Sequence, residues 1–260
     1  MESTLSRGGK LSDVNRRLSI ALVTIVPLLA SCTIDDIATV FGPSPNPELV
    51  QLANRAAADG RDEELAALEA EIARLCGTHA DGTAPQSCAW ELEPEKAPSG
   101  DGLSVMIDGI GKAPAESRPL LVSLAVDQAI NVNPGNDFPV DVDIKADATL
   151  VREMLMQEYA AEYAIGVANA LGDPADVDKL RAAHQQRILR LQELLAPYEV
   201  VPVAEPGYEL AEGEAMPSIK DIERNLEQEW MASAVDAKTT AWRDWAVRGA
   251  ASTQLSVQDS

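Results

Sequence analysis

The sequence predicts an all-α protein of four to five helices joined by long irregular loops. Aromatic residues make up only 4% of the chain, whereas alanine and leucine are abundant, and this composition favours helices that pack through small side chains. Apolar residues recur at intervals of three and four in several stretches, which is the spacing of one helix face. No stretch alternates regularly enough to indicate a convincing strand.

The first 31 residues have the features of a secretory signal peptide. A basic segment precedes a short apolar run over residues 18–30, and its charges are Arg7, Lys10, Arg16 and Arg17. The run is shorter than the roughly 20 apolar residues that a bilayer requires, and Pro27 interrupts it, so we do not expect a membrane-spanning anchor. The Arg16-Arg17 pair leaves twin-arginine export open beside ordinary secretion.

A cysteine follows small and apolar residues at the end of this run, in the order Leu29-Ala30-Ser31-Cys32. This segment resembles the lipobox of bacterial lipoproteins. The resemblance implies that Cys32 is lipidated on its thiol and becomes the first residue of the mature protein. The protein would then be anchored to the cell membrane on its extracytoplasmic face, because about two or three acyl chains bind stably where one binds only marginally.

The chain is strongly acidic, with 21 basic and 42 acidic residues. Residues 1–31 hold four of the basic and two of the acidic residues, so the remaining chain carries a net charge of −23. This charge repels nucleic acid and anionic lipid headgroups. We therefore expect no nucleic-acid partner. The charge either keeps the protein soluble at the cell surface or attracts cations or a basic protein surface.

Residues 32–46 are polar and contain prolines, so they predict a flexible tether. Pro47 suits a helix start, and helical spacing then continues to Cys76. Gly60 is a point where this helix bends or breaks, and Gly77 is its stop signal.

The region from residue 47 to residue 147 is expected to combine N-terminal helices with disulfide-containing loops. Residues 78–114 are rich in proline and glycine and predict a loop, within which residues 103–110 are at most a weak strand. A helix is expected from Arg118 to about residue 130, and irregular chain from there to residue 147.

Two further cysteines, Cys76 and Cys88, form an even pair in a chain expected to enter an oxidising compartment, which favours a disulfide. The competing interpretation is a metal site built from Cys76, His79 and Cys88. A fourth ligand for that site has no obvious source in the sequence.

The second half of the chain predicts a helical hairpin and a last helix. One helix is expected over residues 148–171, ended by Gly172, and a second starts at Asp173-Pro174. So short a connection makes the two helices antiparallel neighbours. A proline-rich segment over residues 197–217 precedes a last helix, which begins at a Ser218 and Asp221 capping box. Its apolar stripe continues through Trp230 toward Trp242 and Trp245, and residues 253–260 are expected to be a frayed tail.

The predicted hairpin brings charged residues together. His184 lies on the apolar stripe of its helix, and residues that face each other across the hairpin have numbers that sum to about 345. We therefore expect one buried polar cluster of Glu158, Glu162, His184 and Arg187. It is either an acid/base or metal site, or a paired network that fixes the register of the helices. The second interpretation is favoured, because Arg187 is a cation and the chain lacks the Glu-x-x-His motif of di-iron bundles.

Four segments resemble the motifs of a ferritin-like domain family of unknown function that occurs in lipoproteins of high-GC Gram-positive bacteria. They span residues 158–167, 183–187, 205–210 and 245–250, with the sequences EYAAEYAIGV, AHQQR, EPGYEL and WAVRGA. The resemblance implies a ferritin-like four-helix bundle over residues 148–252 and implies no particular reaction. The chain before residue 148 departs from the family pattern.

The sequence contains no Gly-x-Ser-x-Gly motif, phosphate-binding loop or dinucleotide fingerprint. We therefore expect a protein without catalytic activity, cofactor or metal. It would act as an accessory or interaction subunit of a membrane-associated complex, respiratory or transport. Two alternatives stay open: a metal-binding or redox bundle that uses Glu158, Glu162, His184 and either Glu227 or Glu229, and a small-ligand carrier with an apolar cavity.

Overall fold

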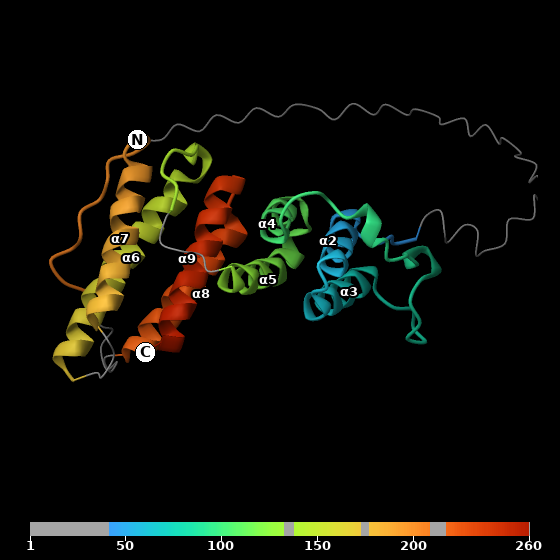
Figure 1. Ribbon diagram of the computed structural model, residues 1–260, viewed down its shortest axis with the longest axis horizontal. Helices are drawn as coiled ribbons and strands as arrows, with labels where there is room; N and C mark the ends of the chain where they lie inside the picture. The colour runs from blue at the N-terminus through green and yellow to red at the C-terminus, as the bar shows by residue number, and fades with distance from the viewer. Residues whose placement is uncertain (1–41, 133–137, 173–176, 209–216, 260) are drawn as a thin grey trace, which may run out of the picture.

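The computed structural model describes residues 42–132, 138–172, 177–208 and 217–259, and Figure 1 shows their arrangement. Within these ranges the protein is all-α, with eight α-helices and no strand. The fold class is confirmed, although the helices exceed the expected four to five. The signal peptide, Cys32 and most of the tether lie outside the described residues. No helix in the described part of the chain is long and apolar enough to cross a membrane.

The first two helices, α2 (Pro47–Ala58) and α3 (Asp62–Cys76), are separated at Gly60. The Asn46 side chain accepts hydrogen bonds from two backbone amides of the first turn of α2, and Pro47 follows it. Gly60 has a φ of 68°, a left-handed conformation that glycine adopts at little cost. The predicted break at Gly60 is therefore confirmed.

Cys76 and Cys88 form a disulfide, with their Cα atoms 6.1 Å apart. The bridge ties the end of α3 to a loop that contains the short helices η1 (Gln86–Cys88) and η2 (Pro94–Lys96). The Asn54 side chain of α2 accepts a hydrogen bond of 2.8 Å from the Glu93 amide and holds the same loop. The predicted disulfide is confirmed, and the bridge leaves neither sulfur available for the alternative metal site with His79, which is exposed.

A helix occupies part of the segment that was expected to be a loop with a weak strand. α4 runs over Gly102–Lys112, and Asp101 caps it by accepting a hydrogen bond of 3.0 Å from the Ser104 amide. Glycines obscured this helix because they lower helix propensity. At Gly109, an added Cβ would lie 2.9 Å from Leu52 of α2. The glycine is therefore needed for the close approach of the two helices.

The helix predicted from Arg118 is present as α5 (Arg118–Asn131), preceded by η3 (Ala115–Ser117). Gln128 of α5 donates a hydrogen bond of 2.8 Å to Glu64 of α3, and Ser117 donates one of 2.6 Å to Glu71. These buried contacts join α3 to the segment around α5. α4 and α5 also pack against the C-terminal helices, as Figure 1 shows.

The predicted hairpin is formed by α6 (Ala148–Ala170), which follows η4 (Lys145–Asp147), and α7 (Val177–Leu195). The contacts pair Glu162 with Arg181 and Glu158 with Arg187, so the two helices run antiparallel. The expected helix caps at residues 173–174 lie outside the described residues.

The expected single last helix is two helices, α8 (Ile219–Asp236) and α9 (Thr240–Asp259). The Ser218 cap of α8 is confirmed, since its Oγ accepts a hydrogen bond from the Asp221 amide. The frayed tail is a wrong prediction, because α9 continues to Asp259 and Thr253 is fully buried.

Asp147, just before α6, explains why the last helix divides. Its carboxylate accepts hydrogen bonds from the Lys238 amide at 2.7 Å, the Thr239 amide at 2.8 Å and the Thr239 hydroxyl at 2.6 Å. The chain turns at these residues without glycine or proline. A carboxylate about ninety positions away in the sequence therefore stabilises the turn, and no local pattern could have revealed it.

α6 to α9, which we call the four-helix unit, has a defined order of directions. Glu158 of α6 contacts Trp230 of α8, whereas Asp147 before α6 contacts Lys238 after α8, so α6 and α8 are antiparallel. Because α6 is antiparallel to both α7 and α8, these two helices run parallel. After α7, residues 196–208 run back along the hairpin, as the orange trace in Figure 1 shows.

Three tryptophans form the aromatic centre of the four-helix unit. Trp230, Trp242 and Trp245 are fully buried, and their ring centroids lie 5.9–6.0 Å apart. They belong to the core and offer no exposed docking face. Gly249 of α9 lies directly against Trp230, where an added Cβ would be 2.6 Å from a ring carbon.

We expect Gly249→Ala to lower the free energy of unfolding by about 1–3 kcal/mol, because the Trp230 ring is enclosed and overpacking forces the helices apart. Gly166→Ala in α6 is the matched control, since nothing lies within 4 Å of its added Cβ. It should raise stability by up to about 1 kcal/mol through helix propensity. Urea unfolding checks both values, and equal changes for the two variants would contradict the packing at Gly249.

Candidate functional site

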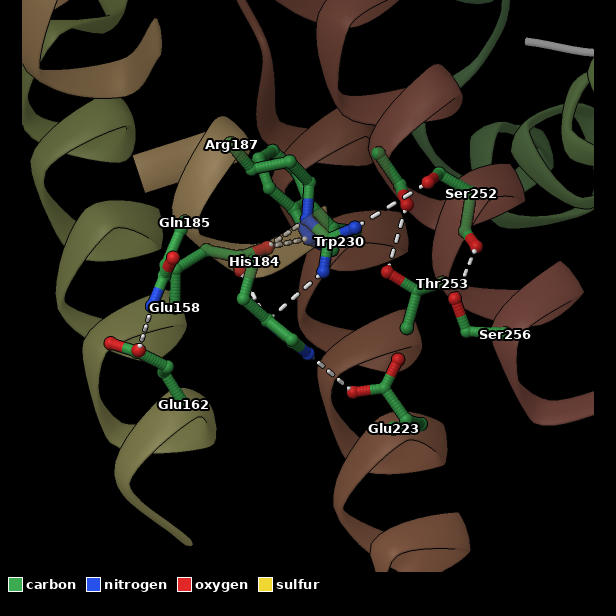
Figure 2. Close-up of polar contacts among 11 residues, drawn as sticks. Glu158, Glu162, His184, Gln185, Arg187, Glu223, Trp230, Ser252, Thr253 and Ser256 are labelled. Carbon is green, nitrogen blue, oxygen red and sulfur yellow. Dashed lines mark hydrogen bonds and ion pairs between the residues drawn. The ribbon is translucent and has the colours of Figure 1, made fainter. Parts of the chain in front are cut away.

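A cluster of charged side chains lies inside the four-helix unit (Figure 2). Glu158 comes from α6, His184 and Arg187 from α7, and Glu223 from α8. All four side chains are fully buried. We call these four residues the polar core.

Glu158 accepts hydrogen bonds from three side chains. Its Oε1 accepts from Arg187 Nε at 2.6 Å and from the Trp230 indole at 3.0 Å, and its Oε2 lies 2.7 Å from His184 Nδ1. A buried carboxylate needs such partners, because leaving it unpaired in the protein interior is very costly. One carboxylate of α6 thus binds side chains of α7 and α8.

His184 uses both of its ring nitrogens. Nδ1 faces Glu158, and Nε2 lies 2.8 Å from Glu223 Oε1 on the opposite side, as Figure 2 shows. Two carboxylate acceptors are both satisfied only when both nitrogens carry a proton. The geometry therefore favours the doubly protonated, positively charged imidazole.

The electrostatics agree with this assignment. Burial acts to raise the pKa of Glu158, but the charges of Arg187 and His184 outweigh it and bring that pKa down to about 2. Burial and the Arg187 charge act to lower the pKa of His184, but Glu158 and the hydrogen bonds to both carboxylates raise it overall. Arg187 Nη2 also lies 3.0 Å from His184 Nδ1, and this one contact would need Nδ1 as an acceptor, so it opposes the charged form while the contacts with the two carboxylates favour it.

The polar core combines two acidic side chains, Glu158 and Glu223, with two basic ones, His184 and Arg187. Arg187 completes its contacts with Ser252 of α9, at 3.4 Å from Nη1, so the network reaches all four helices. Glu223 Oε2 has no hydrogen-bond partner among the described residues. The acidic and basic side chains of the polar core contact one another, and none of them is exposed to solvent.

Glu162 does not belong to the polar core, contrary to the prediction. Its side chain is 24% exposed and contacts Arg181 at 3.3 Å and Gln185 at 2.9 Å, at the outer edge of the hairpin. The predicted pairing of residues across the hairpin was nearly correct. The buried stripe of α6, however, runs through Glu158, Ala161 and Ile165, and Glu162 lies beside that stripe toward solvent.

Sequence reasoning missed Glu223 and expected Glu227 or Glu229 as further acids. The signal was present, because Glu223 lies on the apolar stripe of its helix, four residues after Ile219 and three before Leu226. The same kind of position singled out His184. A polar residue on an apolar stripe is therefore a buried one in both cases, although sequence reasoning used this signal only for His184.

The polar core is poorly arranged for metal chemistry. In the described ranges, no group of three or more His, Cys, Asp and Glu side chains is placed to hold a metal ion. Arg187 donates to Glu158 where a cation would need that carboxylate, and His184 directs both nitrogens at protein oxygens. Chemically, the arrangement can stabilise a helix register.

Comparisons of the chain with protein-family models, with curated proteins and with solved structures find no match in any of the three. The interpretation of the site therefore depends on the residues and contacts described above.

We expect Glu158→Ala to lower the free energy of unfolding by about 3 kcal/mol or more, because it leaves Arg187 buried without its partner. Glu162→Ala, four residues along the same helix, is the matched control. It removes a half-exposed ion pair and should change stability by less than about 1 kcal/mol. Urea unfolding measures both, and a Glu158→Ala effect as small as that of the control would show that the polar core is not buried as described.

The pH dependence of stability should reveal the charge on His184. Because the pKa of His184 is raised above its ordinary 6.5, its contribution is complete below about pH 6.5 and is lost as the pH rises through the folded-state pKa. The pKa of Glu158 falls from 4.5 to about 2, so its contribution is complete above about pH 4.5 and is lost as the pH falls through about 2. The polar core should stabilise the fold most between these limits.

Urea unfolding of the natural chain and of His184→Gln, at about pH 5.5 and about pH 8.5, tests this dependence. The difference in unfolding free energy between the two chains should be larger at the lower pH. The same difference at both values would mean that folding does not raise the pKa of His184, and a larger difference at the higher pH would mean that His184 is neutral in the fold.

Proposed function

We propose that this chain is a lipid-anchored protein of the extracytoplasmic face of the cell membrane. Its ferritin-like bundle acts as an accessory or interaction subunit of a membrane-associated complex, respiratory or transport, and has no catalytic role. The proposal combines a cellular location, a fold and a function, and each is supported by a different part of the chain.

The proposed location is supported by two features of the chain. Leu29-Ala30-Ser31-Cys32 has the residues of a lipobox after a basic and apolar leader. The disulfide between Cys76 and Cys88 is the second support, because disulfides persist in oxidising compartments and are rare in the cytosol. Lipid on Cys32 would then be followed by a tether of about fifteen residues before α2.

The ferritin-like part is supported by the order of helix directions. α7 and α8 run parallel, and residues 196–218 separate them in the sequence; of these, residues 196–208 run back along the hairpin in Figure 1. One long crossover of this kind is typical of ferritin-like bundles and is not found in up-down-up-down bundles. α5 packs against α8 and α9, α4 packs against α9, and α2 and α3 lie beyond α4.

The main support for a role without catalysis is the polar core, whose charged side chains bind one another and are all buried. Ferritin-like metal proteins direct carboxylates and histidines at an ion in the bundle interior. In this chain Arg187 and His184 bind the carboxylates instead, with no side chain of the four exposed. The polar core is therefore best explained as a device that fixes the register of the helices. The function of the protein would then depend on residues at its surface.

Affinity purification of the tagged full chain from its own membranes, in mild detergent, tests this proposal. We expect the natural chain to be recovered with one or more proteins in a fixed ratio, after cross-linking in the membrane and mass spectrometry. Cys32→Ala is the control, because it leaves the described helices intact and removes the acceptor of the lipid. It should carry no lipid, lose at least about 90% of the membrane-bound fraction and lose the partner.

Two results would contradict the proposal. Equal membrane association of the natural and Cys32→Ala chains would exclude the lipid anchor. Recovery of a lipidated chain alone, at several detergent strengths and without cross-linked neighbours, would exclude the interaction role and leave the anchor standing.

A further inference from the structure

A pocket of about 470 Å³ opens on the surface of the four-helix unit, and no residue of the polar core lines it. α6 supplies one wall, the crossover segment between α7 and α8 supplies the other, and Arg181 of α7 lies at the edge. The volume is within the range of small-molecule sites. The backbone of α6 is open to the pocket at Gly166, where nothing lies within 4 Å of an added Cβ.

Three tyrosine rings line this pocket: Tyr159 and Tyr163 of α6, and Tyr208 of the crossover. Tyr159 is fixed, because its hydroxyl donates to Pro202 O at 3.1 Å and accepts from Gln192 at 2.7 Å. The rings of Tyr163 and Tyr208 lie 5.4 Å apart at their centroids and are inclined by 54°. The rings therefore form differently inclined walls, as in the aromatic cages that surround ammonium groups.

The Tyr208 hydroxyl is buried although the residue lines the pocket. Because solvent does not reach this atom, a ligand in the pocket would contact the ring of Tyr208 and not its hydroxyl. Tyr163, in contrast, is 41% exposed and stands at the entrance.

The charges at the pocket favour a cation. Its three charged lining residues are Glu162, Glu205 and Arg181, which sum to one negative charge. Arg181 is engaged by Glu162 at 3.3 Å, so the Glu205 carboxylate at the exposed rim is the uncompensated charge. The net charge of −21 on the whole chain attracts cations to the same surface.

We propose that this pocket binds a small organic cation that carries a methylated or alkylated ammonium group. The ammonium lies against the tyrosine rings with Glu205 as its counter-charge. The apolar lining excludes strongly hydrated metal cations, which carry their water with them. This site is independent of the lipid anchor and of any protein partner.

Choline and its uncharged isostere 3,3-dimethylbutan-1-ol are the probes. They share shape and hydroxyl and differ only in the charge. Saturation-transfer NMR on the full chain in a maltoside detergent, at constant ionic strength, would measure both, with detergent alone as background. We expect choline to bind at least about fivefold more tightly than the isostere.

Pocket variants locate the binding. Gly166→Leu fills the pocket from α6 and should abolish the choline signal, and Tyr163→Leu removes one ring and should weaken binding at least about threefold. Leu189→Ala is the control, because Leu189 is 59% exposed on α7 and does not line the pocket. It should leave binding unchanged. An unchanged thermal unfolding midpoint for Tyr163→Leu, whose side chain is largely at the surface, separates loss of the ring from loss of the fold.

Three results would overturn the proposal. Equal binding of choline and the isostere would identify a merely apolar pocket. Choline binding that survives Gly166→Leu and Tyr163→Leu would place the cation elsewhere on the acidic surface. No binding of either probe at the highest usable concentration would exclude the site.

Discussion

The carboxylate of Glu158 is the interaction on which the four-helix unit depends. It accepts from Arg187 and His184 of α7 and from Trp230 of α8, so a single buried acid fixes three helices relative to one another. A buried anion of this kind is tolerated only if its partners stay in place. The network extends through Arg187 to Ser252 of α9. Any other register of the hairpin would leave charges buried without partners, and this penalty makes the arrangement specific.

The parts of the fold that the sequence could predict are those set by neighbours along the chain. The helix start at Pro47, the Ser218 cap and the Gly60 break follow from local preferences, and the register of a short hairpin placed Glu158 opposite Arg187. The parts that it could not predict depend on distant contacts. Asp147 creates the turn between α8 and α9, and Leu52 explains the glycine at position 109 that obscured α4. The prediction for Glu162 was wrong because the register of a hairpin gives only the height of a residue along the helix axis. It does not say whether the side chain faces the interior or the solvent.

The distribution of polar groups separates the interior of this protein from its surface. In the interior, the acidic side chains contact basic ones and are shielded from solvent, which is expected of a network that holds a bundle together. Outside, an acidic surface and a tyrosine-lined pocket provide the groups that can meet another molecule. The disulfide and the lipobox-like segment fit a protein held at the outer face of a membrane. A bundle with a closed core is a suitable scaffold for such a surface, because binding there needs no change inside.

The central claim is that His184 is a charged imidazole shared between two buried carboxylates. Nitrogen-15 NMR of the ring tests this claim directly, because the two nitrogens of a neutral imidazole give widely separated signals and those of the charged form nearly coincide. The chain has only two histidines, and His79 is exposed, so His184 is readily assigned. At about pH 6 we expect both ring nitrogens of His184 to be protonated, each with a slowly exchanging proton, as the raised pKa requires. A single neutral tautomer would contradict the account.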